Sequence, residues 1–251
     1  MRERAKVRRN GRASYVLCPA VRRTGSPGRT VEGMRIVIAG GHGQIALRLE
    51  RLLAARGDEA AGIIRRPEHG DDLRAAGAEP LVCDLESASA EEVAALLRGA
   101  DAAVFAAGAG PGSGTTRKDT VDRGAAVLFA DAAVLAGVRR HVVVSSMGAD
   151  PAHRGDDVFD IYLRAKGEAD AYVSGLDALD WTILRPGALT NDPGTGRVRL
   201  EADTGRGKVP RDDVAAVITE LLDTPATAGL TLELIAGSTP VSVAVKSVAG
   251  N

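Results

Sequence analysis

The sequence RIVIAGGHGQIA, residues 35–46, decides the fold. Its first five residues form an apolar run typical of a buried strand, and from Gln44 onward the apolar positions are spaced as on a helix. Glycine lets a backbone come close to a phosphate, and a helix N-terminus offers free N–H groups. The stretch therefore predicts a dinucleotide-binding turn with contacts from Gly40, His42, Gly43, Gln44 and Ile45. A plain structural turn would contain the same glycines.

Strand-like and helix-like segments alternate from this turn to Pro186. A chain that alternates in this way forms a parallel sheet with helices on both faces. The predicted fold class is α/β: a doubly wound parallel sheet of the Rossmann type, in a single domain over residues 34–240. A small C-terminal region is expected to form the substrate pocket, and residues 241–251 a C-terminal tail. The predicted strands are 35–39, 59–64, 80–83, 101–106, 141–145, 181–184 and 231–235, and the predicted helices are 44–56, 69–76, 90–97, 119–136, 159–174 and 212–222.

Residues 1–33 differ in charge from the rest of the chain. They hold nine Lys and Arg against two acidic residues, whereas the whole chain has a formal charge of -1. They show no helical or strand period and no continuous apolar core of a secretory signal peptide. We expect a disordered basic leader, with a basic arm for nucleic acid or anionic lipid as the alternative.

The composition of the whole chain narrows its partners. Nearly balanced charges argue against a nucleic-acid partner, and no apolar run approaches the ~18 residues of a membrane span. Two cysteines, Cys18 and Cys83, fit a reducing compartment, so we expect a cytoplasmic protein. The four histidines lack metal-ligand spacing, and no metal is expected.

Charged residues follow the second and third predicted strands, where a dinucleotide would lie. Arg65 and Arg66 follow the second strand; an acid there would bind the adenosine ribose 2′-hydroxyl, whereas arginine suits a 2′-phosphate. The pair favours NADP(H), with NAD(H) or a merely solvated basic pair as alternatives. Asp84 and Leu85 follow the third strand, where a carboxylate can accept from the adenine amino group or cap a helix. The fourth strand leads into small residues that would let a cofactor cross the strand ends: Ala106, Ala107 and Gly108.

The candidate chemistry lies further along the chain. The fifth predicted strand ends in Ser145-Ser146, and Tyr162 and Lys166 follow on a predicted helix. Residues four apart share a helix face, so the phenol and the ammonium can point into one cleft. A neighbouring ammonium favours the phenolate, and a serine hydroxyl can orient a carbonyl, which together suit proton donation during hydride transfer. A partly buried tyrosine beside a surface lysine would give the same pattern.

Taken in order, these motifs resemble the short-chain dehydrogenase/reductases. The G-x-x-G-x-x-A turn and Arg185-Pro186-Gly187 look like the atypical NAD(P)H-binding branch, which includes biliverdin reductase B-like flavin reductases and NmrA-like redox sensors. The resemblance covers residues 34–240. It implies a catalytic trio of Ser146, Tyr162 and Lys166, and further cofactor contacts from Ser145, Lys166, Pro186 and Gly187.

Three functions fit these observations. The first is an NADP(H)-dependent oxidoreductase acting on a small carbonyl, quinone or flavin. The second is a non-catalytic nucleotide-binding sensor, and the third a nucleotide-sugar epimerase or dehydratase. The intact Tyr162 and Lys166 pair favours an enzyme over a sensor, and the length of chain after Met34 leaves little room for a large sugar-nucleotide domain. We expect the oxidoreductase, with a small-molecule substrate, as a monomer or homodimer.

Overall fold

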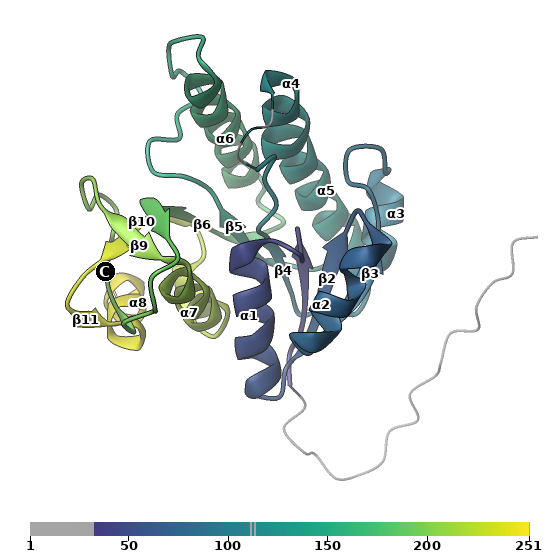
Figure 1. Ribbon diagram of the computed structural model, residues 1–251, viewed down its shortest axis with the longest axis horizontal. Coiled ribbons are helices and arrows are strands. Elements are labelled where there is room, and N and C mark those ends of the chain that lie inside the picture. Colours follow the sequence, from purple (N-terminus) through teal and green to yellow (C-terminus); the bar gives the residue numbers. More distant parts are fainter. Residues whose placement is uncertain (1–32, 111, 113, 251) are drawn as a thin grey trace, which may run out of the picture. The chain divides into compact units, whose positions relative to one another are not determined.

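The computed structural model describes residues 33–110, 112 and 114–250, and in this part of the chain nine strands form one sheet (Figure 1). Their order is β11-β8-β10-β6-β5-β4-β1-β2-β3. Neighbours from β3 to β10 pair in parallel, and β8 pairs antiparallel with β10 and β11. The strands are β1 (Arg35–Ala39), β2 (Glu59–Ile64), β3 (Ala78–Val82), β4 (Ala102–Phe105), β5 (Arg140–Val144), β6 (Asp180–Pro186), β8 (Arg197–Glu201), β10 (Leu230–Ala236) and β11 (Thr239–Pro240).

Helices cover both faces of the sheet, as its apolar strands require. On one face lie α1 (Gln44–Ala55), α2 (Gly70–Ala75), α7 (Arg211–Leu222) and α8 (Val241–Ala249), whose apolar residues pack with Ile36 and Ile38 of β1. On the other lie α3 (Ala90–Leu97), α5 (Ala126–Ala136) and α6 (Val158–Ser174), which pack with Val37 and Ala39. Successive residues of β1 thus enter opposite cores, and the predicted doubly wound α/β fold is confirmed.

The strand order reverses beside β1. The chain passes from β1 to β2 and β3 on one side, then crosses to β4 on the other. In open parallel sheets, ligands bind outside the carboxyl ends of the strands at this point of reversal. The segments that follow β1, β2, β3, β4 and β5 are therefore the ones that can build a site.

The helix expected over residues 119–136 is two elements. After α4 (Thr115–Arg117), the π-helix η2 (Lys118–Ala125) precedes α5. A π-helix holds more residues per turn than an α-helix, so it turns side chains away from the positions that an α-helical spacing predicts, and such turns are frequent at functional sites. It brings Asp122 and Val121 to the edge of the sheet where the ligand site is expected.

The region after Pro186 has more structure than expected. Residues 241–251, expected as a tail, are largely the helix α8: Val241, Ala244 and Val245 recur at helical spacing and are buried in the core shared with α7. A second sheet joins β7 (Ala188–Thr190) to β9 (Lys208–Pro210). Two short 3-10 helices complete the described elements, η1 (Pro67–His69) and η3 (Pro225–Thr227). Residues 1–32 of the expected basic leader lie outside the described residues.

Candidate functional site

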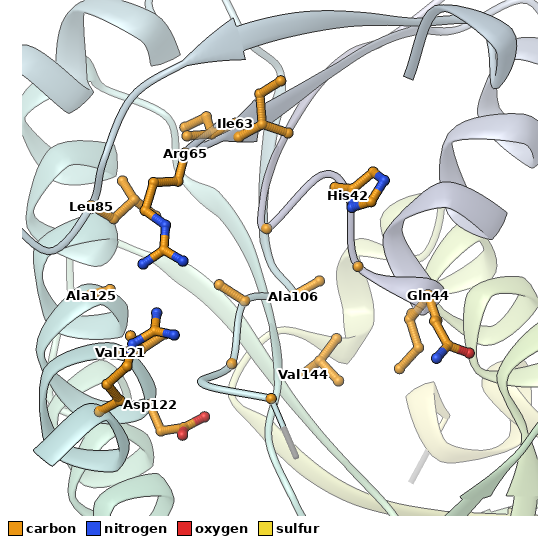
Figure 2. Close-up of a pocket in the computed structure, with 18 of the residues that line it drawn as sticks. His42, Gln44, Ile63, Arg65, Leu85, Ala106, Val121, Asp122, Ala125 and Val144 are labelled. Atoms are coloured by element: carbon orange, nitrogen blue, oxygen red, sulfur yellow. The ribbon is translucent and has the colours of Figure 1, made fainter. Parts of the chain in front are cut away.

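A cavity of about 720 Å³ opens at the carboxyl ends of the parallel strands, a size typical of small-molecule sites. Figure 2 shows His42 and Gln44 on one side of it and Val121, Asp122 and Ala125 on the other. The predicted site residues that line it are Gly40, His42, Gly43, Gln44, Ile45, Arg65, Arg66, Asp84, Leu85, Ala106, Ala107, Gly108, Ser145, Tyr162 and Lys166.

The glycine turn forms part of the cavity wall. Gly40 has a φ of +79°, and a Cβ there would stand 2.6 Å from the Ala107 Cα, so only glycine fits. The Gly43 N–H donates to the Gly40 carbonyl at 2.8 Å, which closes the turn. No side chain in the described part of the chain caps the N-terminus of α1, and the first turn of this helix holds no acidic residue. The turn therefore leaves backbone N–H groups and the positive helix end available to an anion, which fits a pyrophosphate.

The side chain of His42 is held by η1 and α2. Its Nε2 lies 2.8 Å from an Asp72 carboxylate oxygen, and its ring stacks on that of His69 with 3.7 Å between centroids. The stack fixes the imidazole at the rim of the cavity beside the turn.

Four polar side chains meet where β2 and β3 end. Glu86 accepts hydrogen bonds from Arg65 Nη1 at 3.1 Å, from Arg117 Nη2 at 2.8 Å and from the Thr120 hydroxyl at 2.7 Å. The Thr120 hydrogen bond and the two arginines lower the pKa of the Glu86 carboxyl. Arg65 points into the cavity (Figure 2), but its guanidinium is ion-paired with Glu86, a partner that the sequence did not predict.

Asp84 and Leu85 precede Glu86 on the same loop. The Asp84 carboxylate accepts the Glu86 backbone N–H at 3.1 Å, which stabilises the loop, and α3 is capped instead by Ser89. Leu85 faces the cavity (Figure 2). The predicted adenine contact of Asp84 stays a prediction.

Lys166 lines the cavity and is buried, with 4% of its surface exposed. Its Nζ donates to the Val144 carbonyl at 3.2 Å and lies 3.5 Å from Asp122 Oδ1. The Asp122 side chain is 1% exposed, accepts weakly from the Ala109 N–H at 3.4 Å, and has Lys118 Nζ 3.9 Å from its other oxygen. A buried ammonium needs a counter-charge, and Asp122 supplies it.

Tyr162 lines the same cavity, but Lys118 and Phe159 lie against its ring, whereas the sequence predicted Lys166 as its partner. The Lys118 Nζ lies 5.0 Å from the centre of its ring, and the Phe159 ring lies 5.9 Å away. Among the described residues no hydrogen bond joins the Tyr162 phenol to Lys166, and the Lys166 Nζ instead lies 5.5 Å from the centre of the Phe105 ring. The Tyr162 hydroxyl makes no hydrogen bond with the described residues, which leaves it available to a ligand.

Neither serine offers a free hydroxyl in the way the sequence suggested. The Ser145 hydroxyl lines the cavity wall and donates to Asp170 at 2.8 Å, and Arg185 holds the same carboxylate oxygen at 2.9 Å. Burial raises the pKa of Asp170, although Arg185 opposes that rise. The Ser146 hydroxyl donates to the Met147 carbonyl at 3.3 Å, and Ser146 is absent from the cavity lining.

Pro186 and Gly187 also lie outside the cavity lining. The Gly187 N–H donates to the Leu234 carbonyl at 2.9 Å, and a Cβ on Gly187 would stand 2.4 Å from the Gly207 carbonyl oxygen. These residues pack β6 against the small β7–β9 sheet. That packing brings Leu189 and Arg211 to the cavity, with Arg211 donating to the Asn191 side chain at 2.9 Å.

Sequence reasoning missed several lining residues. The position of Asp122 between the apolar residues Val121 and Ala125 could have indicated a buried ion pair, because a carboxylate on the apolar side of a helix needs a cation. For Glu86 and Arg117 the sequence carries no comparable signal, since both resemble ordinary surface charges. The missed residues that line the cavity include Glu86, Arg117, Lys118, Val121, Asp122, Ala125, Leu189 and Arg211.

The doubly wound sheet and the glycine turn that opens onto its point of reversal define a Rossmann-type dinucleotide-binding protein. The chain belongs to the NAD(P)H-binding family, whose model matches residues 40–225. This membership agrees with the resemblance to the atypical short-chain dehydrogenase/reductases, and it shows a nicotinamide cofactor as the family's ligand.

Relatives and solved structures carry more than one function in their names. The chain is 36% identical to the uncharacterized sugar epimerase YhfK of Bacillus subtilis, covering 86% of this chain and 100% of YhfK. A Bacillus halodurans structure with a provisional NAD-dependent epimerase/dehydratase name is 35% identical, covers 86% and 100% of the two chains and has a TM-score of 0.79. ChuY, an anaerobillin reductase from Escherichia coli O157:H7, is 26% identical, covers 80% and 97%, and has a TM-score of 0.68. Among the described residues, no helix is both long and apolar enough to cross a bilayer.

Proposed function

We propose that the protein is an NADPH-dependent reductase of a small carbonyl, quinone or flavin substrate. One observation carries the proposal: a single cavity joins the glycine turn to Tyr162 and Lys166. A dinucleotide that has its pyrophosphate on this turn would extend one half toward Arg65 and Leu85 and the other toward Ser145 and Lys166. The reductase name of ChuY supports this reading.

The residues of the cavity divide the tasks of binding and proton transfer. When bound, a reduced nicotinamide supplies the hydride that the substrate receives at carbon or at a ring nitrogen. The Tyr162 hydroxyl donates the accompanying proton to the substrate oxygen and regains one from solvent. Lys118 over the Tyr162 ring and the buried Lys166 place positive charge near the Tyr162 hydroxyl, which favours the developing oxyanion of the substrate.

Paired variants of two tyrosines on α6 test the proposal. Tyr172 is a matched control because it lies on the same helix, its hydroxyl donates to Asp131 at 2.6 Å, and it does not line the cavity. On a carbonyl substrate we expect Tyr162→Phe to slow turnover about 10²–10⁴-fold with NADPH affinity unchanged. Tyr172→Phe should turn over like the wild type.

The measurement begins with fluorescence titration of NADPH and NADH, followed by turnover on carbonyl, quinone and flavin substrates. Full carbonyl activity of Tyr162→Phe would contradict its role as proton donor. A flavin or quinone needs less help from a proton donor, so a small effect is expected there. Absence of binding for both nucleotides would overturn the proposal as a whole.

A nucleotide-sugar epimerase is the second candidate, favoured by the printed names of YhfK and the Bacillus halodurans structure. An epimerase returns the hydride to the same substrate and produces no net oxidised nucleotide. Conversion of a UDP-sugar without a change in nicotinamide absorbance would therefore distinguish it from the reductase.

A further inference from the structure

The carboxylate of Glu86 is held by donors from three separate elements. Arg65 comes from the end of β2, Arg117 from α4 and Thr120 from η2. Both arginines donate to the same oxygen, Oε2, at 3.1 and 2.8 Å. Two guanidinium groups are thus held close together by one carboxylate oxygen, beside the cavity that all three charged residues line.

The charges of this cluster do not balance. Two cations meet one anion of charge −1, whereas a phosphate monoester carries about −1.5 to −2 at neutral pH and offers three acceptor oxygens. Guanidinium forks match phosphate oxygens with two hydrogen bonds each. The Glu86 side chain is 24% exposed, and those of Arg65 and Arg117 are 41% and 39% exposed, so all three can rearrange toward the cavity.

We propose that Arg65, Arg117 and Thr120 form a phosphomonoester site, and that this site takes the 2′-phosphate of NADPH. In this site the Glu86 carboxylate competes with the phosphate for the hydrogen-bond donors of the three residues. The assignment to the 2′-phosphate rests on the proposed function. It follows from the place of Arg65 at the end of β2, beside the glycine turn on β1, where the adenosine ribose of a bound dinucleotide is expected.

The competition makes Glu86 the residue that sets the preference between the two nucleotides. With Glu86 ionised, a 2′-phosphate must displace a carboxylate from two arginines and then lie near its charge. Removing that charge frees both guanidiniums for the phosphate. A ribose 2′-hydroxyl carries no charge, so NADH gains nothing of the kind.

Isothermal titration of the full chain with adenosine 2′,5′-bisphosphate and adenosine 5′-monophosphate tests the site without turnover. We expect Glu86→Gln to bind the bisphosphate at least about tenfold more tightly than the wild type, because hydrogen bonds to charged groups are among the stronger ones. Binding of the monophosphate should change less than about twofold on the same scale. Arg117→Met should weaken the bisphosphate to nearly the affinity of the monophosphate.

Matched controls use an equivalent ion pair away from the cavity. Glu79→Gln removes a glutamate that pairs with Arg35 at 3.3 Å, and Arg123→Met removes an arginine of η2 that pairs with Asp119 and Glu168. Neither residue lines the cavity, and neither change should alter binding of either probe. Thermal unfolding of all four variants confirms that each is folded.

The same variants are titrated with NADPH and NADH. Unchanged or weaker bisphosphate binding by Glu86→Gln overturns the inference, because Glu86 would then orient the arginines rather than compete for them. Bisphosphate binding that follows the expected pattern while neither nicotinamide nucleotide binds supports the site and overturns the reductase. If the protein reduces a substrate with NADPH while Glu86→Gln changes no affinity, the proposed reductase function stands and the phosphate site is overturned.

Discussion

Glu50 offers a quantitative test of how the glycine turn is supported. This residue of α1 is fully buried, and neither carboxylate oxygen has a hydrogen-bond partner among the described residues. A Cβ on Gly62 would stand 2.6 Å from Glu50 Oε1 and one on Gly41 3.1 Å from it, so the carboxyl group lies directly beneath the phosphate-binding turn. Burial raises the pKa of Glu50 from 4.5 to about 8, with Arg51 opposing the rise.

The raised pKa makes stability depend on pH in a defined direction. Below pH 4.5 the carboxyl is protonated in both the folded and the unfolded chain, so its titration does not change the free energy of unfolding. As pH rises from 4.5 to about 8 the unfolded chain releases this proton and the folded protein keeps it, so the free energy of unfolding falls by about 1.4 kcal/mol per pH unit. The loss reaches roughly 3 kcal/mol at pH 7 and roughly 5 kcal/mol above pH 8.

Glu50→Gln keeps the shape of the side chain and removes its titration. We expect the variant to lie within about 1 kcal/mol of the wild type at pH 5 and to be more stable by several kcal/mol at pH 8. Urea unfolding at pH 5, 6, 7 and 8, followed by the fluorescence of Trp181, measures this difference. Glu91→Gln, an exposed change on α3, should keep the wild-type profile.

An equal fall in stability with pH for Glu50→Gln and the wild type would refute the reasoning, because it would place an ionised carboxylate in the folded core. The turn gives an independent measure. Ionised Glu50 would put a negative charge beneath Gly41, so pyrophosphate affinity of the wild type should fall above pH 8, whereas that of Glu50→Gln should not.

Two further substitutions address the buried charges. Asp122→Asn removes the counter-charge of Lys166, and we expect the free energy of unfolding in urea to fall by about 3 kcal/mol or more. The stability regained in the double variant Asp122→Asn/Lys166→Met measures the coupling between the two side chains. Arg140→Met removes hydrogen bonds to the Leu221 carbonyl at 2.6 Å and to Thr182 and Thr227 at 2.9 and 3.0 Å. Losing these buried hydrogen bonds from a charged donor should cost about 3–5 kcal/mol with cofactor affinity unchanged, and a loss below 1 kcal/mol would contradict this account.

The parallel strands could be predicted because burial on both faces leaves a continuous apolar run. The strands at residues 35–39 and 59–64 end where the sequence places them, and the segments that follow them reach one edge of the sheet. The strands β7, β8, β9 and β11 could not be predicted in this way. In β8 only Val198 and Leu200 are buried, between exposed charged residues, so the segment lacks the continuous apolar run of a buried strand. Its position depends on pairing with β10, far along the chain.

The same limit applies inside the cavity. Helical spacing placed Tyr162 and Lys166 in one cavity correctly, because i and i+4 share a helix face. Helical spacing did not predict which carboxylate pairs with the Lys166 ammonium, because that carboxylate comes from a different element, the π-helix η2. A lysine that is 4% exposed must be paired with a carboxylate, and Asp119, three residues earlier on η2, is exposed and bound to Arg123. Of these two acids only Asp122 is turned inward, so the backbone of η2, rather than the motif itself, decides which carboxylate faces Lys166.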